Sequence, residues 1–184
     1  MEYGELLIRW TIRLSMGLFA AALAEALWRG RLPGAAGVSR WLWTLGCGLF
    51  LAHVAAAFHF YHGWSHAHAV ADTAAKTRAA IGWEFGGGVY VNHLFALAWT
   101  IDVAWSWLAQ ASHRARPRWL AAGLHCFLLF IAVNGLIVFK GGAVRWVSVA
   151  VATLLILVGA WRLARRRAPR RAAASSLRTH DEPA

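Results

Sequence analysis

Histidines gathered in one short run are the residues of this chain best suited to carry chemistry. Four of the nine histidines, His59, His62, His66 and His68, lie within ten residues. Neutral imidazole is a common metal ligand, and residues three or four positions apart on a helix can reach one ion. If the helix that contains His59 continues past it, His59, His62 and His66 share one narrow face. The spacing therefore predicts a ladder of three imidazoles.

A fourth ligand is expected from the next apolar segment, in which His93 lies near the depth of His59. Two histidines on facing helices can bind a haem iron from both sides, or share an ion with further imidazoles. Asp72 and Glu84 are the acids of the connection, and each could bind a metal or orient an imidazole. The predicted cofactor is haem b, held by His59 and His93, or a copper or iron ion. The ligands predicted for the ion are His59, His62, His66 and His93, with Asp72 and Glu84.

An alternative interpretation needs no cofactor. Histidines at an interface can keep their polar tips in water, and a single buried histidine is usually only hydrogen-bonded. We adopt that interpretation for His68, His113 and His180. Polar groups inside apolar spans are costly and tend to mark function, which favours the metal or haem interpretation for His59, His62, His66 and His93.

The elements that must position these histidines are long apolar segments. Hydrophobic residues make up 59% of the 184 positions and charged residues 15%. A helix that crosses a bilayer needs about 20 mostly apolar residues. Five segments come close to this length, each with tryptophans near its ends: residues 6–28, 41–62, 89–108, 119–139 and 144–163. The predicted fold is an all-α, polytopic integral membrane bundle of five transmembrane helices, or of four if the first segment, with Arg9 and Arg13, lies at the interface.

The connections complete this predicted organisation. The longest connection carries a short surface helix over residues 69–81, with Asp72 and Lys76 one turn apart, and then a triple glycine suited to a hinge or a close approach. Residues 1–164 form the transmembrane domain, and residues 165–184 form a basic tail of a composition typical of disorder.

Charge predicts the orientation. With a cytoplasmic tail, thirteen Lys and Arg residues lie on the inner side of the five segments and six on the outer side. Positive loops stay in the cytoplasm, so we expect a bacterial-type inner membrane protein with its C-terminus inside and the histidine-rich loop outside. The net charge of +11 follows from these flanking arginines and does not indicate nucleic-acid binding.

Several polar residues are predicted to lie within the spans: Glu25, His53, Asp102, His125 and Asn134. Ionised acids at such depth need partners, and His53 and His125 are the candidates from other spans. A proton path from His125 through Asp102 and His53 to His59 is one interpretation. Hydrogen bonds that fix helix packing are the preferred one.

The chain lacks the motifs of several enzyme classes. It has no GxSxG, no phosphate loop, no HExxH and no kinase signature. We expect electron transfer or oxidation of a lipid-soluble small molecule, with the bilayer and a quinone or another membrane redox subunit as partners. The alternatives are a non-catalytic accessory or structural subunit of a larger membrane complex, and a metal sensing or delivery protein. Whether the protein is an enzyme stays open.

Overall fold

The structure is a computed structural model that describes residues 2–29, 34 and 37–137, with single positions at 146, 150 and 153. The predictions of a fifth span over residues 144–163 and of a tail over residues 165–184 concern parts of the chain outside these ranges, apart from those three positions.

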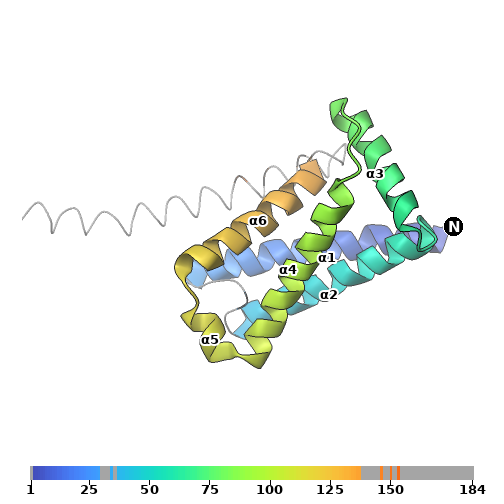
Figure 1. Cartoon of the computed structure of the whole chain (residues 1–184). Helices are drawn as coiled ribbons and strands as arrows, with labels where there is room; N and C mark the ends of the chain where they lie inside the picture. Colours follow the sequence, from blue (N-terminus) through green and yellow to red (C-terminus); the bar gives the residue numbers. More distant parts are fainter. Residues whose placement is uncertain are drawn as a thin grey trace, which may run out of the picture.

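All regular structure in the described ranges is helical, as predicted. The helices are α1 (Glu2–Arg29), α2 (Gly37–Phe60), α3 (His66–Ile81), α4 (Gly88–Leu108), α5 (Gln110–Ala115) and α6 (Arg118–Ile137). Helices α1 and α2 lie along each other, and α4 crosses them and meets α6, while α3 projects away from the bundle (Figure 1). The short helix predicted over residues 69–81 is α3, and it begins three residues earlier, at His66.

Two of the described helices, α1 and α2, are long and apolar enough to cross a membrane. Within α6 the stretch Trp119–Gly135 is apolar but shorter. In the described part of the chain, the structure thus supports two of the predicted spans by length and composition.

An aromatic core joins α1, α2 and α4. Trp43 of α2 and Trp99 of α4 are completely buried, with ring centroids 5.1 Å apart. Phe19 of α1 packs against both rings, at 5.2 Å and 5.3 Å. Aromatic pairs at such separations add to the free energy gained from burial alone.

Gly46 allows this core to close. A Cβ atom at this position would lie 3.1 Å from the Trp99 ring and 3.4 Å from Leu18 Cβ. Its carbonyl accepts a hydrogen bond of 2.7 Å from the buried hydroxyl of Ser15, which ties α2 to α1. A side chain at position 46 would therefore separate the three helices.

We expect Gly46→Leu to lower the free energy of unfolding by about 1–3 kcal/mol, because the core has no room for the added atoms. Gly48→Leu is the matched control, since nothing lies within 4 Å of a Cβ there. Thermal and denaturant unfolding of both variants in detergent measures the difference. Equal stability of the two variants would contradict the packing assigned to Gly46.

Candidate functional site

A turn between α2 and α3 breaks the predicted ladder of histidines. Helix α2 ends at Phe60, and Gly63 and Trp64 follow with φ angles of 53° and 61°. Such positive φ values cannot continue a right-handed helix. Ser65 then caps α3 by accepting a hydrogen bond of 3.2 Å from the His68 backbone N–H. His62 consequently lies in the turn and His66 in α3, so the prediction of one shared helical face with His59 is wrong.

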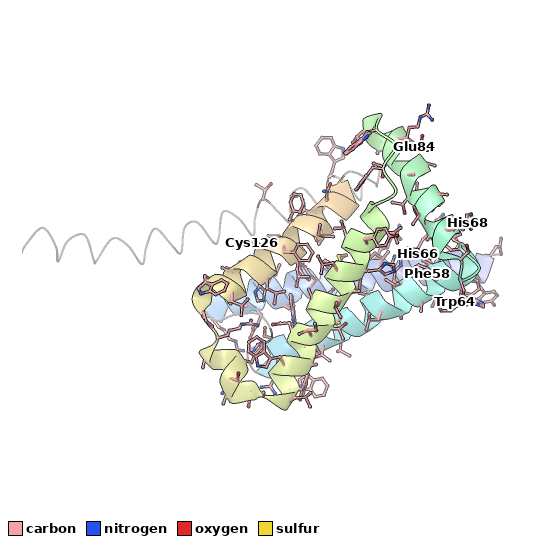
Figure 2. All side chains as sticks on the ribbon, viewed as in Figure 1. Phe58, Trp64, His66, His68, Glu84 and Cys126 are labelled. Carbon is pink, nitrogen blue, oxygen red and sulfur yellow. The ribbon has the colours of Figure 1, made fainter. Side chains whose placement is uncertain are left out.

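The turn arranges four histidines as two pairs. The rings of His66 and His93 are 5.7 Å apart with planes 25° from parallel. The rings of His62 and His68 are 5.5 Å apart and nearly perpendicular. Phe58 contacts both pairs, through His62 at 5.5 Å and His93 at 5.8 Å. We call His62, His66, His68 and His93 the histidine cluster; Figure 2 shows its labelled members near Phe58, where α2 meets α3.

His59 and His68 differ from the sequence prediction: His68 belongs to the histidine cluster, and His59 does not. His59 is exposed, and its Nδ1 accepts a hydrogen bond of 3.3 Å from the Trp64 indole. His93 stacks on His66 in place of His59, while His68, expected to be a solvated side chain, contacts His62. The ring that stacks on His93 is therefore that of His66, and the haem pair of His59 and His93 stays a prediction.

Both acids of the connection are already paired with cations. Asp72 accepts a hydrogen bond of 2.6 Å from Lys76, as the sequence predicts, and Glu84 lies 3.3 Å from Arg78. Glu84 lies at the far end of α3 from the histidine cluster (Figure 2). In the described part of the chain, no three His, Cys, Asp or Glu side chains are close enough together to hold one metal ion.

His62 differs from its neighbours in environment. Burial lowers its pKa, and the Asp72 carboxylate opposes this effect. The lowered pKa favours the neutral imidazole at neutral pH. The Nδ1 atom of His62 is buried and has no hydrogen-bond partner.

A close approach at Gly86 places the start of α4 against α3. A Cβ atom on Gly86 would lie 2.7 Å from the Val70 carbonyl oxygen, which confirms the close-approach geometry predicted for the triple glycine. Gly82 caps the C-terminal end of α3: its φ of 79° suits glycine, and its N–H donates to the Arg78 carbonyl at 2.8 Å. These two glycines let the chain return along α3 and bring His93 to His66.

Asp102 forms a second polar site at the other end of α4. Its Oδ2 accepts a hydrogen bond of 2.9 Å from the Trp43 indole, and its Oδ1 lies 3.1 Å from His113 Nε2 and also accepts from Arg116. The side chains of Asp102, His113 and Arg116 are each about 1% exposed. The hydrogen-bond partners of Asp102 are therefore Trp43, His113 and Arg116, which the sequence did not predict. Of the two predicted partners, His125 interacts with Asp102 electrostatically.

The other predicted intramembrane residues make local or interhelical contacts. His53 hydrogen-bonds the Ile8 carbonyl at 3.0 Å, which joins α2 to α1, and Glu25 pairs with Arg29 on its own helix at 2.7 Å. His125 bonds the Ala121 carbonyl at 2.6 Å and packs on Trp43 at 5.4 Å. Asn134 is half-buried on α6. The bonds of Trp43 and His53 support the packing interpretation over the proton path.

Sequence reasoning missed His113 and Arg116 as partners of Asp102. His113 was interpreted as a solvated or simply hydrogen-bonded histidine, and Arg116 only as one of the thirteen positive charges on the inner side. Asp102 itself could have indicated these partners. A buried carboxylate requires a cation, and the connection that follows α4 supplies arginines.

No protein-family model, curated protein or solved structure matches this chain.

We expect Gly86→Ala to destabilise the protein by about 1–3 kcal/mol, because the new methyl group overlaps the Val70 carbonyl and the loop must shift. Gly123→Ala on α6 is the control, since a Cβ there meets nothing within 4 Å; alanine should be neutral or slightly stabilising in that helix. Thermal unfolding in detergent compares the two. A Gly86→Ala variant as stable as the control would rule out the close approach.

Removing the cation beside Asp102 should strongly destabilise the folded protein. Arg116→Met is expected to cost about 3–5 kcal/mol, because it leaves a buried carboxylate without its charged partner. The double variant with Asp102→Asn should recover part of this loss, and Arg114→Met, at an exposed arginine, should cost less than about 1 kcal/mol. A double-mutant cycle of denaturant unfolding measures the coupling; strictly additive losses would show that the two charges do not interact.

Proposed function

We propose that this protein is a multi-pass inner-membrane protein that binds a copper or iron ion in the histidine cluster. The ion would serve electron transfer or the oxidation of a lipid-soluble small molecule such as a quinone. One observation carries this proposal: imidazoles from the α2–α3 turn, α3 and α4 lie around Phe58 as two close pairs.

The spacing within each pair suits two ligands of one ion. Metal–nitrogen bonds of about 2.0–2.1 Å in a tetrahedral arrangement put two imidazole centroids roughly 5–6 Å apart. The observed separations are 5.5 Å and 5.7 Å. Rotation of the rings about their side-chain bonds can then turn two nitrogens toward a shared ion. Imidazole suits copper, iron and zinc alike, and we choose copper or iron because one-electron chemistry is useful in a redox membrane.

A non-haem ion fits these residues better than haem. An axial haem pair needs two imidazoles that point at one iron from opposite faces of the porphyrin. Here the ring of His93 lies against His66 and Phe58, and His59 is hydrogen-bonded to Trp64. To bind a metal ion, the imidazole rings need only rotate locally. To bind haem, His93 would have to lose its contacts with both His66 and Phe58.

The outward faces of the helices support placement in a bilayer. Only 22% and 28% of the most apolar windows of α1 and α2 are buried within the protein. A core helix of a water-soluble protein buries its apolar residues, so these faces need another apolar environment. Large exposed apolar residues continue on α4, at Leu94, Leu97 and Ile101. We include α4 and α6 among the spans for this reason, and the loop charges orient the histidine cluster outward.

Metal delivery is a second candidate, favoured by the grouping of the histidines in twos. A pair of protein ligands holds an ion less tightly than three or four ligands do and leaves positions open for transfer to a partner. Delivery and redox chemistry differ in how readily the ion leaves, which a mild chelator measures.

Elemental analysis and optical and electron paramagnetic resonance spectra of the purified full chain test the proposal. We expect copper or iron to bind, and His66→Ala and His93→Ala to reduce the bound metal by at least about tenfold, since each removes one of two ligands. His180→Ala, in the tail, is the matched control. Rapid loss of metal to a mild chelator would favour delivery.

Two outcomes would overturn the non-haem site. One is the absence of copper and iron after reconstitution, or equal metal content in all the variants. The other is a Soret band that disappears in His59→Ala and His93→Ala, which would instead support the haem arrangement predicted from the sequence.

A further inference from the structure

Two arginines meet at the end of the bundle where α2 begins and α5 follows α4 (Figure 1). Arg40 lies in the first turn of α2, and Arg114 lies in α5. With its amide oriented so that the oxygen faces these cations, Gln110 accepts a hydrogen bond of 2.8 Å from Arg114 Nη2 and further bonds from both Nη atoms of Arg40. Two cations from separate helices therefore share one acceptor.

The shared acceptor does not balance the charge of the two arginines. The amide of Gln110 is neutral, and two like charges that contact the same atom repel each other. Asp102, the acid of α4 at this end of the bundle, accepts its charged hydrogen bond from Arg116. An anion that contacts Arg40 and Arg114 together would remove the repulsion between them.

A ligand can reach both arginines from outside the protein. Arg114 is exposed, and Arg40 is half-buried, with its guanidinium carbon 4.8 Å from the centre of the exposed Trp107 ring. The Trp107 indole donates a hydrogen bond of 2.9 Å to Thr44, which fixes the ring under Arg40. A guanidinium group carries five N–H donors, and the bonds to Gln110 use only part of them.

The surroundings of the arginines indicate which anion binds. The rings of Trp41 and Trp107 lie 4.9 Å apart next to Arg40, and both are exposed. Tryptophans concentrate at the headgroup level of a bilayer, where lipid phosphates lie. In the orientation proposed above, this end of the bundle faces the cytoplasm, and basic sites between helices on that side bind anionic headgroups.

We propose that Arg40 and Arg114 together bind the phosphate of an anionic phospholipid headgroup. Both guanidinium groups donate charge-assisted hydrogen bonds to the phosphate oxygens. Gln110 keeps the two groups close together, and Trp107 keeps Arg40 in place. The proposal uses the bilayer placement proposed above but not the metal. The histidine cluster lies at the other end of α4, so a loss of metal in His66→Ala should leave lipid binding unchanged.

The full chain in maltoside micelles, which contain no phosphate, provides the test. Native mass spectrometry measures binding of a short-chain phosphatidylglycerol, with diacylglycerol of the same chain length as the phosphate-free control. We expect Arg40→Gln and Arg114→Gln each to weaken phosphatidylglycerol binding roughly fivefold, because each removes one of two cations. Arg13→Gln is the matched control: Arg13 is exposed on α1 and lies 5.7 Å from the Trp10 ring. This control should bind the lipid as the unmodified chain does.

A second variant keeps the test decisive if an arginine variant fails to fold. Gln110→Glu places a carboxylate between the two arginines, so it should raise the melting temperature of the lipid-free chain and weaken phosphatidylglycerol binding roughly tenfold or more.

Competition with inorganic phosphate separates the two sources of a phosphate group. Lipid that stays bound supports a headgroup site, whereas displacement of the lipid by inorganic phosphate would overturn the assignment to a headgroup. Equal binding of phosphatidylglycerol and diacylglycerol would also overturn the proposal. So would equal phosphatidylglycerol affinity in Arg40→Gln, Arg114→Gln and Arg13→Gln, or unchanged affinity in Gln110→Glu.

Discussion

The buried carboxylate of Asp102 is the constraint on which the arrangement of helices depends. A charge removed from water is tolerated only where several donors surround it. Trp43 supplies one donor from α2, His113 supplies another from α5, and Arg116 follows directly after α5. These contacts join α2, α4 and the chain beyond α4 at one point. They also hold Trp43 where it stacks on Phe19 and Trp99, so the polar site and the aromatic core stabilise each other.

Helix α4 connects Asp102 to the histidine cluster, so the packing at Asp102 affects the position of His93. Near its end α4 is held by Asp102, and at its start the chain is held against α3 by the approach of Gly86 to Val70. His93 lies between these two attachments, so both of them determine the position of its side chain and the direction in which its ring faces. The contact of His93 with His66 therefore depends on packing at two places, and neither place contains a histidine of the cluster.

Helices were predictable from the sequence because their signals are local. Apolar length predicted α1 and α2, and alanine content with the Asp72–Lys76 pair predicted α3. The histidine ladder was wrong because it assumed that α2 continues, whereas Gly63 and the unusual positive φ of Trp64 end it. A positive φ at tryptophan has no sequence signature. The Asp102 partners were missed for a related reason: the connection folds back onto its own helix, which periodicity does not reveal.

The two ends of the molecule suit different chemistry. At the histidine end, the rings of His66 and His93 are exposed and in pairs, so an ion held there would keep coordination positions open for another molecule. The bonds around Asp102 are buried and charge-assisted, which favours a fixed structure with long-lived contacts. If the metal proposal holds, exchange occurs at the histidine cluster while the buried bonds around Asp102 stay fixed. Those fixed bonds would then be what keeps His93 facing His66 when the cluster gains or loses its ion.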